Sequence, residues 1–216
     1  MPNRVPFQSW RFYHLYNRGT DKRVIFHDES DWRRFLLGLI ASNGQLPVKS
    51  ADLREKSPEE LAAKRGQTLI DLCAYCLMPN HFHLVVRVKK GVDTGKFLRK
   101  HLIGYTMYFN RKYGRSGVLF QGRTKSKLIK DARHLITLLA YVNENPLELL
   151  APGADSTAAQ DVSAVLAAYP FASYRDYATP DARAERAALE FSLLPRHIGA
   201  ALKFRRDAIS FGGASG

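Results

Sequence analysis

Two histidines separated by a single residue are the feature of this sequence best suited to chemistry. His81 and His83 open a run rich in β-branched residues, HFHLVVRV. Because side chains two residues apart in a strand leave the same face, both imidazoles would converge while Phe82 enters the opposite layer. Two imidazoles on one face can hold one metal ion, but strand histidines also occur simply hydrogen-bonded or exposed. The spacing therefore predicts a candidate metal site and leaves the structural alternative open.

A tyrosine and an asparagine form the second candidate group. Tyr141 and Asn145 are four residues apart and therefore adjacent on one face of a predicted helix, with His134 two turns earlier on the same stripe. Such a helix could present a phenol and an amide together. The alternative is a packed tyrosine and an asparagine that ends the helix before Pro146, and spacing alone favours this alternative.

The two cysteines offer a competing metal site. Cys73 and Cys76 could join the histidines around zinc. In a strand over 68–77, however, they would point to opposite faces, so only one could reach the histidines unless a turn replaced the strand. The sequence favours buried cysteines without metal, and their small number indicates a reducing cytoplasm rather than a disulfide scaffold.

The net charge indicates the class of partner. The chain has 216 residues, with 33 lysines and arginines against 20 aspartates and glutamates, which gives a formal net charge of +13. Such an excess points to a polyanion, with nucleic acid the first candidate. The 45% hydrophobic content suffices for a core and excludes a disordered, collagen-like or coiled-coil chain.

This positive charge is concentrated where acidic residues are absent. No aspartate or glutamate lies between Asp93 and Asp131, and aromatic residues such as Phe120 are interleaved with the cations. Aromatic faces beside cations suit unpaired bases over a charged backbone, whereas the alternative is a solvated face above core aromatics. The predicted DNA-binding side chains are Lys96, Arg99, Lys100, Arg111, Lys112, Arg115, Arg123, Lys125 and Lys127.

Alternating and helical hydrophobic patterns predict the elements that position these groups. We expect a hairpin around Met78, Pro79 and Asn80, with both of its strands central in a sheet. Asp28 or Ser30 would cap the first helix, and Asp131 would begin the third. The predicted strands are 10–17, 68–77, 81–88 and a short β-prone pair within 118–130, and the predicted helices are 30–42, 96–113 and 131–145.

Two segments fall outside this pattern. Residues 47–66 are strongly charged and predict a surface insertion, with one short helix beginning at Ser57 and Pro58. Residues 151–216 are rich in alanine and predict a C-terminal extension of unknown role. The aromatic, polar N-terminus lacks the continuous apolar stretch of a signal peptide, and no window is long enough to cross a membrane. The sequence thus predicts neither export by such a signal nor a membrane protein.

Four blocks of this sequence, taken together, resemble the REP-associated tyrosine transposases, which are relatives of the single-tyrosine HUH transposases. The blocks occur in the same order and span about residues 10 to 150. They are YHLYNRG at 13–19, CLMPNHFHL at 76–84, GVLFQGRTKS at 117–126 and YVNENP at 141–146. The combination of MPNHFH with the later YxxxNP is specific.

The resemblance implies a fold and a chemistry. It implies an α+β catalytic domain over 1–150, with a ferredoxin-like antiparallel sheet, helices packed on it and the HUH motif on a central strand. It also implies that Tyr141 attacks a phosphodiester of single-stranded DNA to give a 5′-phosphotyrosine. Mg²⁺ or Mn²⁺ would be held by His81 and His83, with Asn145 as the third ligand. His14 remains a weaker candidate for DNA contact or support of the site, as does His134.

The partners follow from the same resemblance. We expect single-stranded or hairpin DNA of the REP type, a cytoplasmic, nucleoid-associated protein, and either a homodimer or a monomer. Two other functions stay open. One is a non-catalytic nucleic-acid-binding protein derived from a transposase. The other is a metal-dependent phosphodiesterase that uses activated water and forms no covalent adduct.

Overall fold

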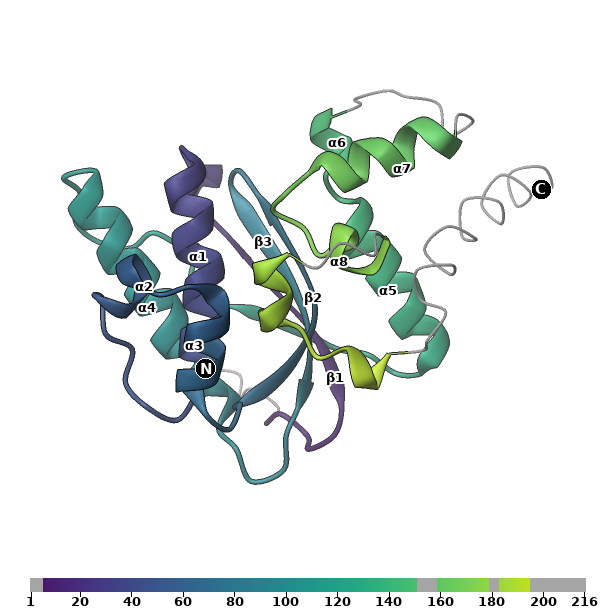
Figure 1. Cartoon of the computed structure of the whole chain (residues 1–216), viewed down its shortest axis with the longest axis horizontal. Coiled ribbons are helices and arrows are strands. Elements are labelled where there is room, and N and C mark those ends of the chain that lie inside the picture. The colour runs from purple at the N-terminus through teal and green to yellow at the C-terminus, as the bar shows by residue number, and fades with distance from the viewer. Residues whose placement is uncertain (1–5, 151–158, 179–182, 195–216) are drawn as a thin grey trace.

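A four-stranded antiparallel sheet in the order β2-β3-β1-β4 forms the centre of this computed structural model (Figure 1). The model describes residues 6–150, 159–178 and 183–194. The strands are β1 (Phe12–Arg18), β2 (Ile70–Met78), β3 (His81–Val88) and β4 (Lys125–Leu128). Strand β3 lies between β2 and β1, so the histidine pair is on a central strand, as predicted.

Helices cover both faces of the sheet. Helices α1 and α4 pack together on one face, and α5 contacts β2 and β3 on the other. The order of strands and principal helices is βαββαβ, which is the ferredoxin-like arrangement predicted above. No helix in the described ranges is long and apolar enough to cross a membrane. The α-helices are α1 (Glu29–Ser42), α2 (Asp52–Glu55), α3 (Pro58–Arg65), α4 (Thr94–Lys112), α5 (Ala132–Glu144), α6 (Leu147–Leu150), α7 (Ala159–Ala168) and α8 (Tyr174–Ala178).

Aspartates at the expected positions cap the helices α1 and α5. Asp28 accepts a hydrogen bond from the backbone N–H of Asp31 at the start of α1. Asp131 accepts one from the backbone N–H of His134, at 2.8 Å, at the start of α5. Each bond satisfies one of the N–H groups that a first helical turn leaves free. Both predicted caps are confirmed.

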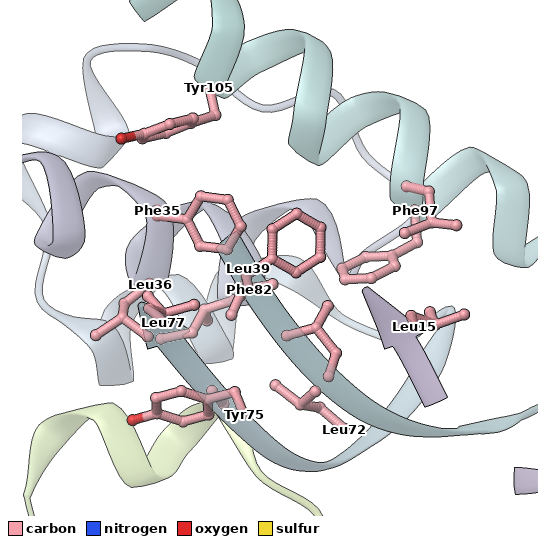
Figure 2. Packing of buried hydrophobic residues seen from close by; sticks show 14 of the residues in the cluster. Leu15, Phe35, Leu36, Leu39, Leu72, Tyr75, Leu77, Phe82, Phe97 and Tyr105 are labelled. Atoms are coloured by element: carbon pink, nitrogen blue, oxygen red, sulfur yellow. The ribbon is translucent and has the colours of Figure 1, made fainter. Parts of the chain in front are cut away.

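The main core lies between the sheet and the helices α1 and α4 (Figure 2). Phe35 of α1 and Phe97 of α4 pack over Leu15 and Phe82 from the two central strands. Burial of a large apolar side chain stabilises a fold by about 1.5–3 kcal/mol. Because these side chains alternate along β1 and β3, the polar residues between them must face the opposite side.

A second core on that opposite side corrects the prediction for the cysteines. Cys73 and Cys76 are both buried among α5 side chains rather than on opposite faces of β2. The reason is a shift of register between Leu72 and Ala74, where one extra residue in β2 changes the alternation. Among the described residues, no three of the types His, Cys, Asp and Glu are grouped to hold a metal. The zinc alternative therefore has no support.

Strand β2 is an edge strand, not the central strand predicted. Its free edge is covered by the segment around Ala172, which forms an isolated bridge with Cys76. The N–H of Leu77 donates to the carbonyl of Phe171, and the N–H of Ser173 donates to the carbonyl of Tyr75. These bonds occupy groups that an exposed edge would offer to another chain.

The β-prone pair predicted within 118–130 is also only half correct. Lys125–Leu128 forms β4 and pairs with β1, but Phe120 makes a single bridge with Gly19. Gly117 and Gly122, which flank residues 118–121 on the two sides, have positive φ, so the chain turns there instead of extending.

The two segments outside the predicted pattern are packed parts of the structure. In 47–66, Leu53 and Leu61 are buried in the main core, so this segment is more than a surface insertion. Its predicted short helix corresponds to α3, which Ser57 caps. Beyond residue 150, the described side chains of Val162 and Leu166 complete the second core. The remaining residues of the predicted extension, 151–158, 179–182 and 195–216, lie outside the described residues.

Candidate functional site

Two neighbouring strands bring three histidines to one face of the sheet. His81 and His83 alternate with buried apolar residues along β3, and His14 projects from the adjacent β1. The Nε2 atom of His14 lies 2.8 Å from the Nδ1 atom of His83, with the two rings stacked at 5.0 Å between centroids. The rings of His81 and His83 are also 5.0 Å apart, edge to face. The predicted histidine pair is therefore part of a triplet.

Burial keeps these imidazoles neutral. Removal from water lowers the pKa of His83 to about 3, with a further contribution from His14 and His81. Burial also lowers the pKa of His14 to about 4, assisted by the positive charge of Lys127. The pKa of His81 is lowered by the same cause. A neutral imidazole has a free lone pair, which is the form that binds a metal ion.

Helix α5 places its tyrosine and asparagine beside the histidines. The ring of Tyr141 stands edge-on to His83, with the centroids 5.7 Å apart, and lies 6.4 Å from the ring of His14. Tyr141 is 48% exposed, so this residue is accessible from solvent. Asn145 is buried at the end of α5, with its Oδ1 atom 3.3 Å from Nε2 of His81. The structure thus brings all four predicted site residues together.

The hydrogen bonds of His81 indicate whether His81, His83 and Asn145 could bind a cation. Its Nδ1 atom lies 2.7 Å from Oδ1 of Asn80, so the ring proton belongs on Nδ1, where it is donated to that oxygen. The Nε2 atom then carries a lone pair, and it faces another acceptor, Oδ1 of Asn145. Two acceptors that face each other are satisfied by a cation between them. The donor set of two neutral imidazoles and one amide oxygen therefore fits a divalent metal ion.

A cleft of about 640 Å³ opens beside His81. Tyr16 of β1 lines this cleft. It pairs with His83 of β3 on one side and with Lys125 of β4 on the other, so all three side chains lie on one face of the sheet. The ammonium groups of Lys125 and Lys127 lie 5.9 and 5.8 Å from the centre of the Tyr16 ring. Two of the predicted DNA-binding lysines thus lie beside the histidines.

Comparison with known proteins identifies the architecture. No protein-family model and no curated protein matches this chain. A solved structure described as a REP-associated tyrosine transposase bound to a REP hairpin matches with a TM-score of 0.51 and 12% sequence identity. The alignment covers 82% of this chain and 84% of that chain. This chain has the fold of a REP-associated tyrosine transposase.

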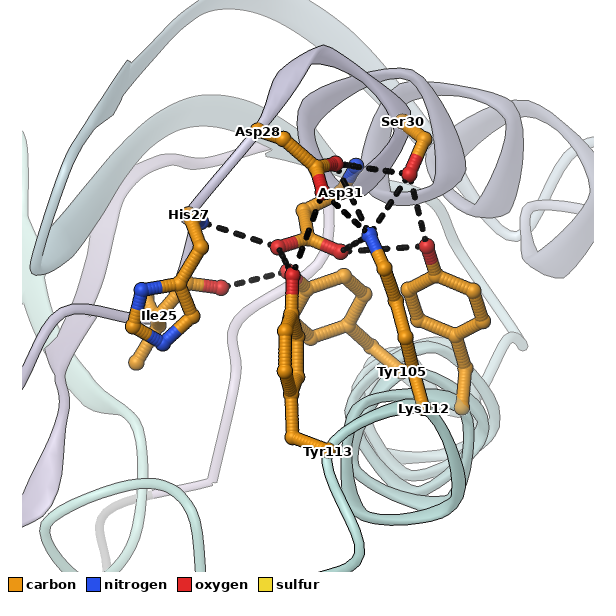
Figure 3. A network of polar contacts seen from close by, with 9 residues as sticks. Ile25, His27, Asp28, Ser30, Asp31, Tyr105, Lys112 and Tyr113 are labelled. Carbon is orange, nitrogen blue, oxygen red and sulfur yellow. Dashed lines mark hydrogen bonds and ion pairs between the residues drawn. The ribbon is translucent and has the colours of Figure 1, made fainter.

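Several of the predicted DNA-binding residues are already engaged in contacts within the protein. Lys112 ties the end of α4 to the start of α1, with its Nζ atom 2.7 Å from Asp28 and 2.8 Å from the buried Asp31 (Figure 3). Tyr113 donates to the same Asp31 carboxylate at 2.7 Å. Lys100 donates to two backbone carbonyls at 2.6 Å. These lysines fix helix positions.

The other predicted DNA-binding residues differ in their exposure and in their partners. Arg111 and Arg123 are exposed. Lys96 donates to Gln45 at the surface, and Arg99 pairs with Asp93. The guanidinium of Arg115 lies 5.6 Å from the centre of the Phe109 ring, with one nitrogen buried.

Sequence reasoning missed two contributors to the site and undervalued a third. Tyr16 stacks on His14, with 4.8 Å between ring centroids, and Gln121 lines the cleft beside Arg18. His14, which the sequence predicts only as a weaker candidate for the site, is hydrogen-bonded to His83. His14 and Tyr16 are two residues apart in a predicted strand, so the sequence could have predicted that both lie on one face of the sheet. His134 accepts a hydrogen bond from the Lys130 N–H near the start of α5.

Proposed function

We propose that this protein cleaves and rejoins single-stranded DNA through a covalent bond to Tyr141. The observation that carries the proposal is the position of an exposed phenol on α5 beside His83 and His81 on a central strand. A tyrosine nucleophile needs both access to a phosphodiester and neighbours that stabilise the charge that develops there. The transposase fold agrees with this assignment.

The reaction is a balanced exchange of esters. The Tyr141 oxygen would attack the scissile phosphorus and displace the 3′ oxygen of the preceding nucleotide. The phenol loses its proton, the departing oxygen gains one, and the 5′ end stays attached to the protein as a phosphotyrosine. Because one phosphoester replaces another, the reverse attack by a 3′-hydroxyl can rejoin DNA without an external energy source.

His81, His83 and Asn145 would hold Mg²⁺ or Mn²⁺. When bound there, the ion would polarise the scissile phosphate and offset its developing charge. For His83 to bind through Nε2, its proton must sit on Nδ1 and be donated to Nε2 of His14. His14 would therefore orient the imidazole, while Asn80 does the same for His81.

The proposed partner is single-stranded DNA next to a hairpin, including hairpins of the REP type. The match to a hairpin-bound transposase and the net charge of +13 support a DNA partner. Lys125 lines the cleft, and Lys127 lies beside it near the Tyr16 ring, so their ammonium groups would contact phosphates that enter the cleft. The proposal locates the protein with the chromosome, in the cytoplasm.

The test is a search for the covalent intermediate. Labelled single-stranded hairpins from the flanks of its own gene are incubated with the protein and Mg²⁺ or Mn²⁺, then resolved on a denaturing gel. We expect a metal-dependent adduct that resists detergent and disappears in Tyr141→Phe. Mass spectrometry should place the nucleotide on the peptide that contains Tyr141.

The Tyr16→Phe variant tests the other phenol in the site. Loss of the adduct in Tyr16→Phe with retention in Tyr141→Phe would assign the nucleophile to Tyr16. Cleavage without an adduct, unchanged in Tyr141→Phe, would establish hydrolysis by activated water. Binding without cleavage of any flanking hairpin would establish a non-catalytic DNA-binding protein.

A further inference from the structure

A second hollow, separate from the histidines, lies between α4 and residues 117–124. Its volume is about 670 Å³, within the range of ligand-binding clefts, and we call it the α4 groove. Ile103 and Met107 of α4 line it on one side and Val118 on the other. Met107 is 68% exposed and Val118 is 72% exposed. Large apolar side chains gathered in the open indicate a surface that binds something.

The charged side chains that line the α4 groove are all positive. Of the described residues that line it, none is acidic, and two are arginines, Arg99 and Arg123. Arg99 lies 2.6 Å from Asp93, but both side chains are more than half exposed, so this ion pair is weak and can be exchanged for a phosphate. No ion pair within the described ranges involves Arg123. An apolar floor with arginines at its edge complements bases joined to phosphates.

A fixed ridge joins the α4 groove to the cleft beside His81. Asn17 lines both hollows, and its side chain donates to the carbonyl of Gly122 at 3.2 Å. The N–H of Gln121 donates to the carbonyl of Arg18 at 2.8 Å, which holds the ridge against the end of β1. Gln121 lines the cleft, whereas Phe120 and Gly122 line the groove. A strand leaving the cleft needs only to cross this ridge to enter the groove.

We propose that the α4 groove binds the unpaired bases of the same DNA strand whose phosphate lies at Tyr141. This proposal rests on the proposed function and adds the place where the strand continues. Base faces pack on Ile103, Met107 and Val118, while Arg99 and Arg123 contact the phosphates. Because packing on base faces tolerates any sequence, the groove adds affinity for single strands without selecting bases.

Binding of a fluorescein-labelled dT12 oligonucleotide tests the proposal. Anisotropy is measured for the full chain at fixed salt, with a chelator present so that no cleavage occurs. Met107→Glu and Val118→Glu should each weaken binding about tenfold, since they remove apolar contact and add a charge that repels phosphate. Leu46→Glu is the matched control, because Leu46 is 60% exposed and does not line the groove.

Ultraviolet cross-linking with a bromodeoxyuridine 12-mer gives a second readout in the unmodified protein. We expect cross-links in the tryptic peptides 101–111 and 116–123, which carry the groove side chains. A thermal melt of each variant checks folding. Both groove variants binding dT12 within about twofold of Leu46→Glu, with no cross-link in these peptides, would overturn the proposal.

Two further outcomes distinguish a failure of the groove proposal from a failure of the proposed function. If the Tyr141 adduct forms but the groove variants bind dT12 normally, the groove proposal alone fails. If the groove variants lose dT12 affinity but no adduct forms on any hairpin, the groove is a single-strand site and the transesterase function fails. Conversion of a dimer to a monomer by Met107→Glu, with unchanged dT12 affinity, would make the groove a contact between two copies and overturn the proposal.

Discussion

The Nε2 atom of His14 lies 2.8 Å from the Nδ1 atom of His83, across the boundary between two adjacent strands. One of these nitrogens must donate and the other accept, so each ring determines the tautomer of the other. With the proton on Nδ1 of His83, its remaining nitrogen is free to bind a metal ion. We therefore propose that His14 positions His83 for the proposed metal site.

Replacement of His14 should weaken metal binding without removing a ligand. We expect His14→Ala to reduce Mn²⁺ affinity about 10–100-fold, because His83 loses the partner that orients its ring. Calorimetric titration with Mn²⁺ measures this change directly, and excess Mn²⁺ should restore adduct formation. His134→Ala is the control, with an unchanged titration expected. Equal Mn²⁺ affinity of His14→Ala and the wild type would show that His14 does not position the ligand.

Lys112 should prove to be structural. In Lys112→Met, the buried carboxylate of Asp31 loses its cation, and we expect the free energy of unfolding to fall by about 3 kcal/mol. Denaturant titration measures this change. The adjacent, exposed Arg111 provides the comparison, since Arg111→Met should leave stability nearly unchanged. A fully stable Lys112→Met with strongly weakened DNA binding would instead support the contact predicted from the sequence.

His101 should make the protein sensitive to acid. It is buried between α1 and α4, and burial lowers its pKa to about 3 despite a smaller opposing contribution from the backbone of Gly38. The unfolded chain, with a His pKa near 6.5, binds more protons than the folded chain between these two values. The stability contributed by this group is therefore present above about pH 6.5 and is lost as the pH falls.

His101→Leu should lessen that loss. Between pH 7 and pH 5 the variant should lose about 2 kcal/mol less stability than the wild type, as measured by urea titrations at each pH. His14 and His83 have lowered pKa values too, so part of the slope should remain. Parallel pH profiles of the variant and wild type would show that His101 does not contribute.

The side chain of Ser173 is one of the groups that attach the covering segment to the edge of β2. The hydroxyl of Ser173 accepts from the buried N–H of Tyr75 at 3.0 Å and lies 2.8 Å from Oδ1 of Asn143. Ser173→Ala leaves that N–H without this partner, which should cost about 1–3 kcal/mol of unfolding free energy. Ser192→Ala, at an exposed position, should change the same thermal or denaturant unfolding curve little. Equal curves for the two variants would contradict the role of Ser173.

The features that depend on near neighbours could be predicted from the amino-acid sequence. The alternation in HFHLVVRV places His81 and His83 on one face, and that face follows from backbone geometry alone. The four-residue spacing of Tyr141 and Asn145 puts them on one helical face for the same reason. The aspartates that cap α1 and α5 act within three residues, so they too could be predicted from sequence.

Which of these local groups meet depends on the pairing of strands and the packing of helices. The pairing of β1 with β3 brings His14 to His83, 69 residues away, and the packing of α5 sets Tyr141 beside them. The shift of register in β2 turns Cys73 to the same face as Cys76, and the ion pair with Asp31 holds Lys112 between α4 and α1. Local geometry sets the direction of a side chain, whereas strand register and helix packing depend on contacts between distant residues that spacing does not encode.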